Sequence, residues 1–191
     1  MSITREIRPA ISMVVLFTIV LGFILPGIFT GVMQVVLPWQ ANGSLITEDG
    51  HAIGSVLIGQ NFTDAKYFQP RPSALDKPYD ASTSGASNLA PTSATLVKTV
   101  AQRVAAYVKA YGPGPVPADA VTSSGSGLDP DISLANALRQ APAVARARHL
   151  PTTRVVALVR QMTHHAVLGF IGTDHVNVLK LNLALDHLPT S

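Results

Sequence analysis

The hydrophobic pattern is dominated by one long apolar run near the N-terminus. No charged residue lies between Arg8 and Glu48, and residues 11–36 (ISMVVLFTIVLGFILPGIFTGVMQVV) are almost wholly apolar. A helix over this range would be about 39 Å long, whereas the hydrocarbon core of a bilayer is about 30 Å thick. The run therefore predicts one transmembrane helix that tilts or bends, and Pro26 followed by Gly27 is the expected bend.

Basic residues flank the predicted span on one side only. Arg5 and Arg8 precede it, whereas the next Lys or Arg along the chain is Lys66. Because positive charge is retained on the cytoplasmic side, this asymmetry predicts a cytoplasmic N-terminus at residues 1–10 and a single extracytoplasmic domain at residues 37–191. The predicted location is therefore the plasma (inner) membrane, crossed once.

A cleaved signal peptide is the rival interpretation of the same apolar run. Residues 11–25 alone have the length of a signal-peptide core, and residues 41–43 offer a small-residue cleavage region. Apolar residues continue beyond Leu25, where a cleavage region should turn polar, so the sequence favours an uncleaved anchor. A cleaved chain would instead be a secreted binding protein.

The pattern after the span predicts a small mixed α and β (α+β) domain. Apolar positions recur at three- and four-residue steps over residues 92–111, which predicts a helix with one face on a core. Capping residues at 91–93 and a stop at Gly112 bound this helix. Short strands are expected at residues 44–46, 55–58 and 176–178.

Prolines divide the second half of the domain into expected helices. Asp129 is the expected N-cap of a helix whose first residue is Pro130, and Pro142 and Pro151 are each expected to begin a new helix. The segment 151–162 places its apolar side chains on one face. These side chains belong to Val155, Leu158, Val159 and Met162.

Composition narrows the class of partner. Charged residues make up 13% of the chain, against about 25% in soluble domains, which agrees with an apolar span. The formal net charge is +3 and the basic residues do not cluster, which argues against nucleic acid as a partner. The chain has no cysteine, so disulfides, thiol catalysis and thiolate metal sites are excluded.

The sequence lacks the motifs of hydrolytic and conducting proteins. It has no Gly-Lys pair for a phosphate-binding loop and no DKTGT segment of a P-type pump, since Asp76 and Lys77 are followed by Pro78. His164 and His165 are adjacent rather than spaced as in HExxH, and no serine stands in a nucleophile elbow. One span without a filter loop cannot conduct potassium alone. We expect no catalytic residue and no metal site, and an anchored extracytoplasmic hydrolase is the alternative.

Five segments of the domain carry a family resemblance. They are residues 54–74 (GSVLIGQNFTDAKYFQPRPSA), 84–92 (SGASNLAPT), 121–133 (VTSSGSGLDPDIS), 141–148 (APAVARAR) and 176–185 (VNVLKLNLAL). Together and in this order they resemble the C subunit of the bacterial Kdp potassium-transporting ATPase. The resemblance extends from the LPWQANGSL segment after the span almost to the C-terminus. It departs from the family at the proline-rich loop 112–117 and at Ala143, where an arginine would be expected.

The resemblance implies a non-catalytic accessory subunit of an ATP-driven, high-affinity potassium uptake complex. The implied partners are a channel-like potassium-binding subunit, an ATP-hydrolysing subunit of the P type, and membrane lipid. In the family this subunit is needed for assembly and acts as a catalytic chaperone that promotes ATP binding by the hydrolysing subunit. No cofactor of its own is implied, and ATP would act through the complex. From an extracytoplasmic domain, such an effect must cross the membrane as a coupling free energy.

Two loops hold the candidate site residues. The segment 59–74 (GQNFTDAKYFQPRPSA) mixes aromatic side chains with amides, prolines and an arginine, which are residue types of interface anchors. We expect it to dock on the channel-like subunit; the alternative is that its aromatic residues plug the domain's own core while the polar residues tie the loop. The docking candidates are Gln60, Asn61, Phe62, Tyr67, Phe68, Arg71, Pro72 and Asn88. A second loop, Ser126, Gly127, Leu128 and Asp129, superficially resembles a nucleotide signature, although a glycine-rich turn into a helix cap is the simpler interpretation.

Overall fold

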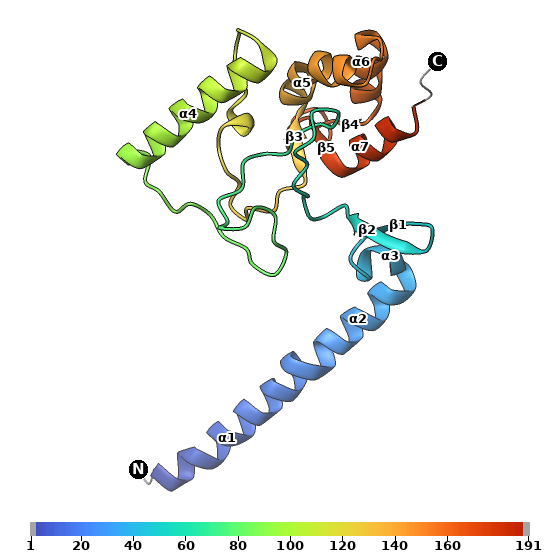
Figure 1. Cartoon of the computed structure of the whole chain (residues 1–191). Coiled ribbons are helices and arrows are strands. Elements are labelled where there is room, and N and C mark those ends of the chain that lie inside the picture. The colour runs from blue at the N-terminus through green and yellow to red at the C-terminus, as the bar shows by residue number, and fades with distance from the viewer. Residues whose placement is uncertain (1–2, 189–191) are drawn as a thin grey trace. The chain divides into compact units, whose positions relative to one another are not determined.

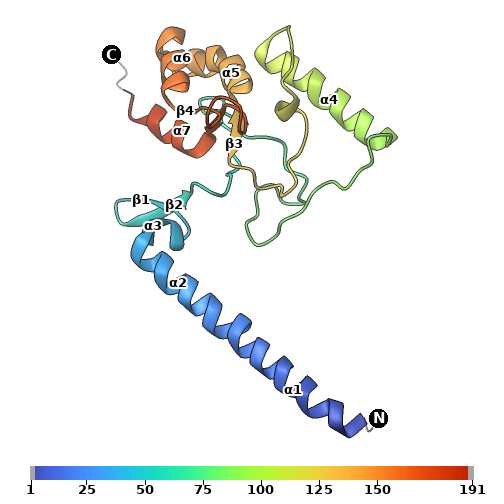
Figure 2. The same ribbon diagram turned by 180° about the vertical axis from the view of Figure 1, so that it is seen from behind.

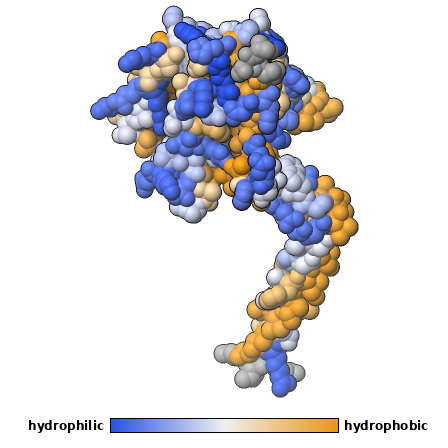
Figure 3. Space-filling view, turned by 45° about the vertical axis from the view of Figure 1, so that its right-hand side comes forward, coloured by the Kyte–Doolittle hydropathy of each residue, from blue (hydrophilic) through white to orange (hydrophobic). Residues whose placement is uncertain are grey.

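The first unit of the protein is a long apolar helix. The computed structural model describes residues 3–188, in which contacts divide the chain into two compact units, residues 1–45 and 46–191. In the first unit, α1 (Ile3–Ile19), a π-helical turn η1 (Val20–Ile24) and α2 (Leu25–Val36) follow one another (Figure 1). The stretch Glu6–Val36 is long and apolar enough to cross a membrane, and hydrophobic side chains largely cover it (Figure 3). This agrees with a single candidate span within the described residues.

A wide turn interrupts this helix just before its proline. The N–H of Leu25 bonds to the carbonyl of Val20, five residues back, which defines the π turn. Pro26 has no N–H for the carbonyl of Gly22, and its ring crowds that carbonyl, so the preceding turn widens. The irregularity expected at Pro26 and Gly27 therefore lies one turn earlier. The short helix α3 (Pro38–Ala41) completes the unit.

The second unit contains two small antiparallel sheets. Strands β1 (Leu45–Glu48) and β2 (His51–Ser55) form a hairpin. Strands β3 (Asp131–Ser133), β4 (Thr163–His164) and β5 (His175–Asn177) form a sheet in the order β3-β5-β4. Val176 on the central strand faces Ile132 on one neighbour and Thr163 on the other. Val176 and Ile132 are both buried, so this sheet carries its apolar side chains into the core.

Three helices enclose the core next to this sheet. They are α5 (Leu134–Ala147), α6 (Thr152–Gln161) and α7 (Val178–Asp186), which lie together beside the sheet of β3, β5 and β4 (Figure 1) and are seen from behind in Figure 2. Their inward faces supply most of the buried apolar side chains, and burial of these chains drives the packing. The core consists of Phe68, Ile132, Ala137, Ala141, Val144, Ala145, Val155, Leu158, Val159, Val176, Val178, Leu181 and Leu185.

The helix α4 (Ala94–Tyr111) is less buried than its sequence predicted. Its bounds agree with the expected helix, with Ser93 as N-cap accepting from the N–H of Leu96 and Gly112 as the C-cap. Only Tyr107 of this helix is buried, however, and Val97 is 62% exposed. Leu96, Val100, Val104, Val108 and Tyr111 are partly buried, so the expected face is confirmed except at Val97, and α4 contacts α5.

Several expected boundaries in the second half were also wrong. Asp129 does not cap a helix: residues 131–133 pair with β5 instead, and α5 begins after Ser133, whose hydroxyl accepts from the N–H of Asn136. Pro142 lies inside α5 without ending it. The strand expected at 55–58 is a turn in which the N–H of Ile58 bonds to the carbonyl of Ser55. The helix after Pro151 and the strand near 176–178 were confirmed.

Candidate functional site

Phe68 anchors the candidate docking loop in the core of the domain. Its side chain is fully buried, with 0% exposure. The N–H of Phe68 donates to the Oδ1 atom of Asn182 at 2.8 Å, and the Nδ2 atom of Asn182 donates back to the Phe68 carbonyl at 3.1 Å. Asn182 on α7 is itself 1% exposed. The carboxamide thus satisfies both backbone groups of Phe68 where water cannot reach them.

A second buried amide holds the next residue in the same way. The N–H of Gln69 donates to the Oε1 atom of Gln140 at 2.7 Å, and the Nε2 atom of Gln140 donates to the Gln69 carbonyl at 3.1 Å. Gln140 on α5 also donates to Asn136 at 3.0 Å. Tyr107 on α4 donates to the same Asn136 oxygen at 2.9 Å, and burial raises the pKa of Tyr107 to about 12, so its phenol stays a donor. The loop is therefore tied to α4 and α5 by one network.

Tyr67 lies in a charged cluster at the edge of the loop. Its hydroxyl donates to Asp186 at 2.9 Å, and this hydrogen bond raises the pKa of Tyr67. The Arg148 guanidinium lies 4.9 Å from the Tyr67 ring centroid, pairs with Asp186 and donates through Nε to the Lys66 carbonyl. The ring of Phe62 lies 5.4 Å from that of Tyr67. These contacts connect the loop to both α5 and α7.

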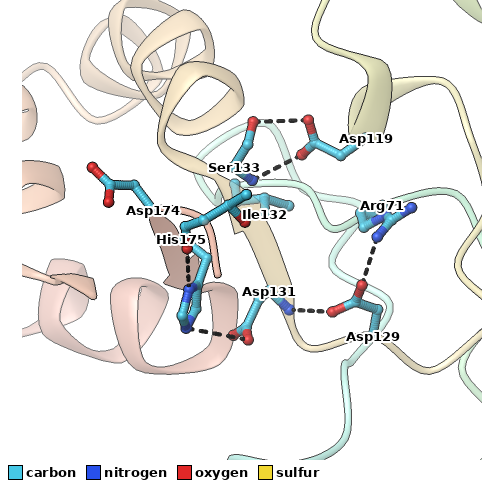
Figure 4. A pocket seen from close by; sticks show the side chains of 9 residues that line it. Arg71, Asp119, Asp129, Asp131, Ile132, Ser133, Asp174 and His175 are labelled. Carbon is cyan, nitrogen blue, oxygen red and sulfur yellow. Dashed lines mark hydrogen bonds and ion pairs between the residues drawn. The ribbon is translucent and has the colours of Figure 1, made fainter. Parts of the chain in front are cut away.

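Arg71 connects the loop to the chain that enters β3. Its Nη1 atom lies 2.7 Å from Oδ2 of Asp129, while the other carboxylate oxygen of Asp129 accepts from the N–H of Asp131 at 3.0 Å (Figure 4). The carbonyl of Arg71 accepts from the hydroxyl of Tyr79 at 2.6 Å, and burial raises the pKa of that phenol. Arg71 is thus fixed at both its side chain and its backbone.

A cavity of about 270 Å³ lies beside Arg71 and collects four aspartates (Figure 4). Each carboxylate accepts hydrogen bonds within the domain: Asp119 from Ser133, Asp129 from Asp131, Asp131 from Asn177, and Asp174 from Ala166. Over residues 3–188, no group of three or more His, Cys, Asp or Glu residues is placed to hold a metal ion. The four carboxylates therefore stabilise the chain around the cavity through hydrogen bonds to backbone N–H groups and to the side chains of Ser133 and Asn177.

The second candidate loop, residues 126–129, is hydrogen-bonded to three other loop segments of the domain. Its carbonyls accept from Gly85 at Ser126, from the hydroxyl of Ser73 at Gly127, and from Gly59 at Leu128. The N–H of Gly127 donates to the Ser124 hydroxyl at 2.9 Å, and the N–H of Leu128 donates to the Ser126 hydroxyl at 3.1 Å. A phosphate cradle needs such N–H groups to be available. These bonds favour a turn that organises the domain over a nucleotide loop.

The remaining docking candidates differ in how available they are. Asn61 and Asn88 are exposed, whereas Pro72 is partly buried. The Nε2 atom of Gln60 donates to the carbonyl of Ile53 at 2.7 Å, which ties this residue to β2. Phe68 therefore fills the domain's own core, and Gln60 and Arg71 tie the loop to the rest of the domain. Docking stays a prediction, for which the exposed asparagines have the most accessible side chains.

Sequence reasoning missed the residues that hold the loop. Gln140 and Asn182 were not singled out, although each is a lone amide in an apolar helical segment, RQAPAVA and LKLNLAL. A polar residue on the buried face of an amphipathic helix is such a signal, because it must find a partner inside the fold. The hydrophobic periodicity of a helix cannot identify the partner of such an amide, since Phe68 lies 114 residues before Asn182.

These features define a class of protein, with one candidate membrane helix and a small α+β domain. The polar clusters described above connect loops and helices within that domain. Comparison with known proteins gives the family. The sequence model of the family described as "K+-transporting ATPase, c chain" (KdpC) matches residues 7–187. The chain belongs to this family, whose members are subunits of a potassium-transporting ATPase of the P type.

Curated relatives match over nearly their whole length. The "Potassium-transporting ATPase KdpC subunit" of Mycobacterium tuberculosis strain H37Rv is 51% identical over 187 residues, which cover 96% of this chain and 99% of that protein. The protein of the same name from Gemmatimonas aurantiaca is 51% identical over 186 residues, covering 96% and 94%. That from Allorhizobium ampelinum is 52% identical over 182 residues, covering 95% of both. The resemblance inferred from the five segments is thereby confirmed.

Proposed function

We propose that this subunit acts as a non-catalytic accessory chain whose domain docks on the channel-like, potassium-binding subunit outside the cytoplasm. The observation that carries this proposal is the loop 59–74, which is immobilised from behind by Asn182 and Gln140 while Asn61 stays exposed. A loop ordered before it binds loses little conformational entropy on docking. Such pre-organisation suits an assembly surface.

The extracytoplasmic placement rests on charge asymmetry around the span. Arg5 and Arg8 lie at the N-terminal end of the candidate span Glu6–Val36, and no Lys or Arg follows the span before Lys66. The positive-inside rule therefore puts the domain on the far side of the membrane from the N-terminus. The ATP-hydrolysing subunit would bind nucleotide on the opposite side.

The proposed effect on ATP is indirect. We propose that docking of this domain favours the conformation of the complex in which the hydrolysing subunit binds ATP more tightly, which is the role of a catalytic chaperone. A coupling of this kind between separate sites typically changes affinity about 5- to 150-fold. The occupied N–H groups of Gly127 and Leu128 support this indirect route over direct nucleotide contact by this chain.

A matched pair of variants tests the docking surface. Asn61→Arg adds bulk and charge at an exposed amide within the loop, and Gln102→Arg makes the same change at an exposed amide on α4. In the purified complex, Asn61→Arg should reduce retention of this subunit and raise the KM for ATP, whereas Gln102→Arg should change neither. Urea denaturation should show that both variants fold as stably as the unmodified chain. Equal retention and equal KM in both variants would refute docking through this loop.

A further inference from the structure

An exposed apolar hairpin joins β4 to β5. Residues 166–173 (AVLGFIGT) contain no charged side chain, and the hairpin is bounded by His165 and Asp174. Four large hydrophobic residues project from it: Val167, Leu168, Phe170 and Ile171 are 64%, 79%, 75% and 53% exposed. Neighbouring apolar side chains exposed to this extent form a patch that soluble surfaces usually avoid.

The exposure is built into an ordered turn. Val167 and Ile171 exchange both backbone hydrogen bonds, each at 2.9 Å, and the N–H of Gly169 bonds to the carbonyl of Ala166 at 3.0 Å. Leu168 and Gly169 have φ values of 55° and 80°, which is the left-handed geometry that reverses the chain at the tip. The structure thus holds the four hydrophobic side chains outward.

The base of the hairpin is polar and fixed by one carboxylate. Asp174 accepts from the N–H of Ala166 at 3.0 Å and lies 3.0 Å from Nδ1 of His165. His164 and His175 stack on the adjoining strands, with ring centroids 5.5 Å apart. The hairpin therefore passes from an exposed, polar base to an uncharged, apolar tip within a few residues.

We infer that this hairpin tip inserts into the headgroup and acyl boundary of the membrane that carries the chain's own span. The inference rests on the proposed attachment through Glu6–Val36, but it requires neither the ATP role nor a particular side of the membrane. The apolar tip gains by leaving water, and no charge must be desolvated with it. Its backbone N–H groups at Val167, Gly169 and Ile171 are already bonded within the hairpin, which a water-poor medium demands.

The size and chemistry of the tip favour lipid over a protein partner. Four side chains fall short of the roughly 800 Å² that each partner buries in a standard protein interface. The tip also carries no side-chain donor or acceptor between Ala166 and Gly172 that would specify a protein partner. A lipid boundary needs neither a large area nor directional contacts. The chain's own span keeps the domain at a high effective concentration near the bilayer, so a small contact is sufficient.

Depth-dependent quenching tests this inference on the full chain. Because the chain has no cysteine, Phe170→Cys provides one labelling site at the tip, and Gln102→Cys on α4 provides a matched exposed control. Each variant carries an environment-sensitive fluorophore and is placed in nanodiscs of phosphatidylethanolamine and phosphatidylglycerol, with or without spin-labelled lipid. Recovery of the chain in the nanodiscs separately checks the span.

The inference predicts that lipid spin labels quench the Phe170→Cys probe at least two-fold more than the Gln102→Cys probe with this chain alone. Adding Leu168→Asn should remove most of that difference, because asparagine tolerates the left-handed backbone of this turn but is polar. Equal quenching of both probes would overturn the inference. So would a tip probe that becomes protected from water only when the other ATPase subunits are present, which would assign the hairpin to a protein partner.

Discussion

Asn182 and Phe68 form a closed pair of hydrogen bonds between a helix side chain and a loop backbone. The carboxamide accepts from the Phe68 N–H at 2.8 Å and donates to the Phe68 carbonyl at 3.1 Å, with both residues buried. The Asn182 side chain thus satisfies the backbone N–H and carbonyl of Phe68, as a neighbouring strand does in a sheet. This pair and its neighbour, Gln140 with Gln69, fix the buried centre of the candidate docking loop.

Removing this amide should destabilise the domain. Asn182→Ala leaves the N–H and carbonyl of Phe68 buried without partners, which predicts a loss of about 2–4 kcal/mol in the free energy of unfolding. Urea denaturation of the full chain in detergent measures it. Asn61→Ala removes an exposed asparagine from the same loop and should stay within about 0.5 kcal/mol of the unmodified chain. Comparable losses for the two variants would show that the hydrogen bonds between Asn182 and Phe68 do not hold the loop.

Substituting two glycines near the second candidate loop distinguishes a structural role of this loop from nucleotide binding. Gly127 has a φ of +70°, and a Cβ there would lie 2.8 Å from Cγ of Leu75, whereas a Cβ on Gly125 meets nothing within 4 Å. Gly127→Ala should therefore lower the free energy of unfolding by about 1–3 kcal/mol, and Gly125→Ala should change it little. Neither should alter the KM for ATP of a complex that still assembles. A raised KM with Gly125→Ala and unchanged stability would instead indicate nucleotide contact at this loop.

The fold was predictable from the sequence where periodicity is local. The apolar run, the helix at 94–111 and the helix after Pro151 all follow from side chains a few residues apart. The start of α5 was mispredicted because Asp129 and Pro130 together make a good local helix start. Pairing of residues 131–133 with β5 overrides that preference, and it depends on residues more than forty positions later.

The direction in which each candidate site residue points could not be predicted from the sequence. The sequence draws attention to the aromatic and amide residues of the loop 59–74, whose role in docking stays a prediction, but the direction in which each points depends on distant partners. Phe68 is held inward where Asn182 on α7 and Gln140 on α5 accept from the N–H groups of Phe68 and Gln69. The spacing of residues within the loop does not predict these partners. The hairpin at 166–173 was overlooked because a short apolar run is equally typical of a buried strand.

Acid should loosen the base of the exposed hairpin. The N–H of Ala166, and then the ring of His165, lower the pKa of Asp174 below its ordinary value of 3.8. Since the folded-state pKa is depressed, this stabilisation is present above the unfolded-state pKa and is lost as the pH falls through the folded-state value. The urea midpoint of the unmodified chain should exceed that of Asp174→Asn at neutral pH, and the difference should vanish below the folded-state pKa.

A second carboxylate provides the control for this pH dependence. Asp76→Asn removes one negative charge from an exposed loop outside the hairpin cluster. Its urea midpoint should follow that of the unmodified chain across the same pH range. If the gap between the unmodified chain and Asp174→Asn were constant with pH, the carboxylate of Asp174 would not be the group that holds the hairpin.

The side of the membrane on which the domain lies is the most direct test of the account. A single thiol introduced by Ser87→Cys, at an exposed position in this cysteine-free chain, is treated on intact cells with a membrane-impermeant reagent. Ser2→Cys on the other side of the span serves as the opposite control. We predict labelling at position 87 in intact cells and at position 2 only after lysis. Protection at position 87 until lysis would place the domain in the cytoplasm and contradict an effect on ATP that acts through the membrane.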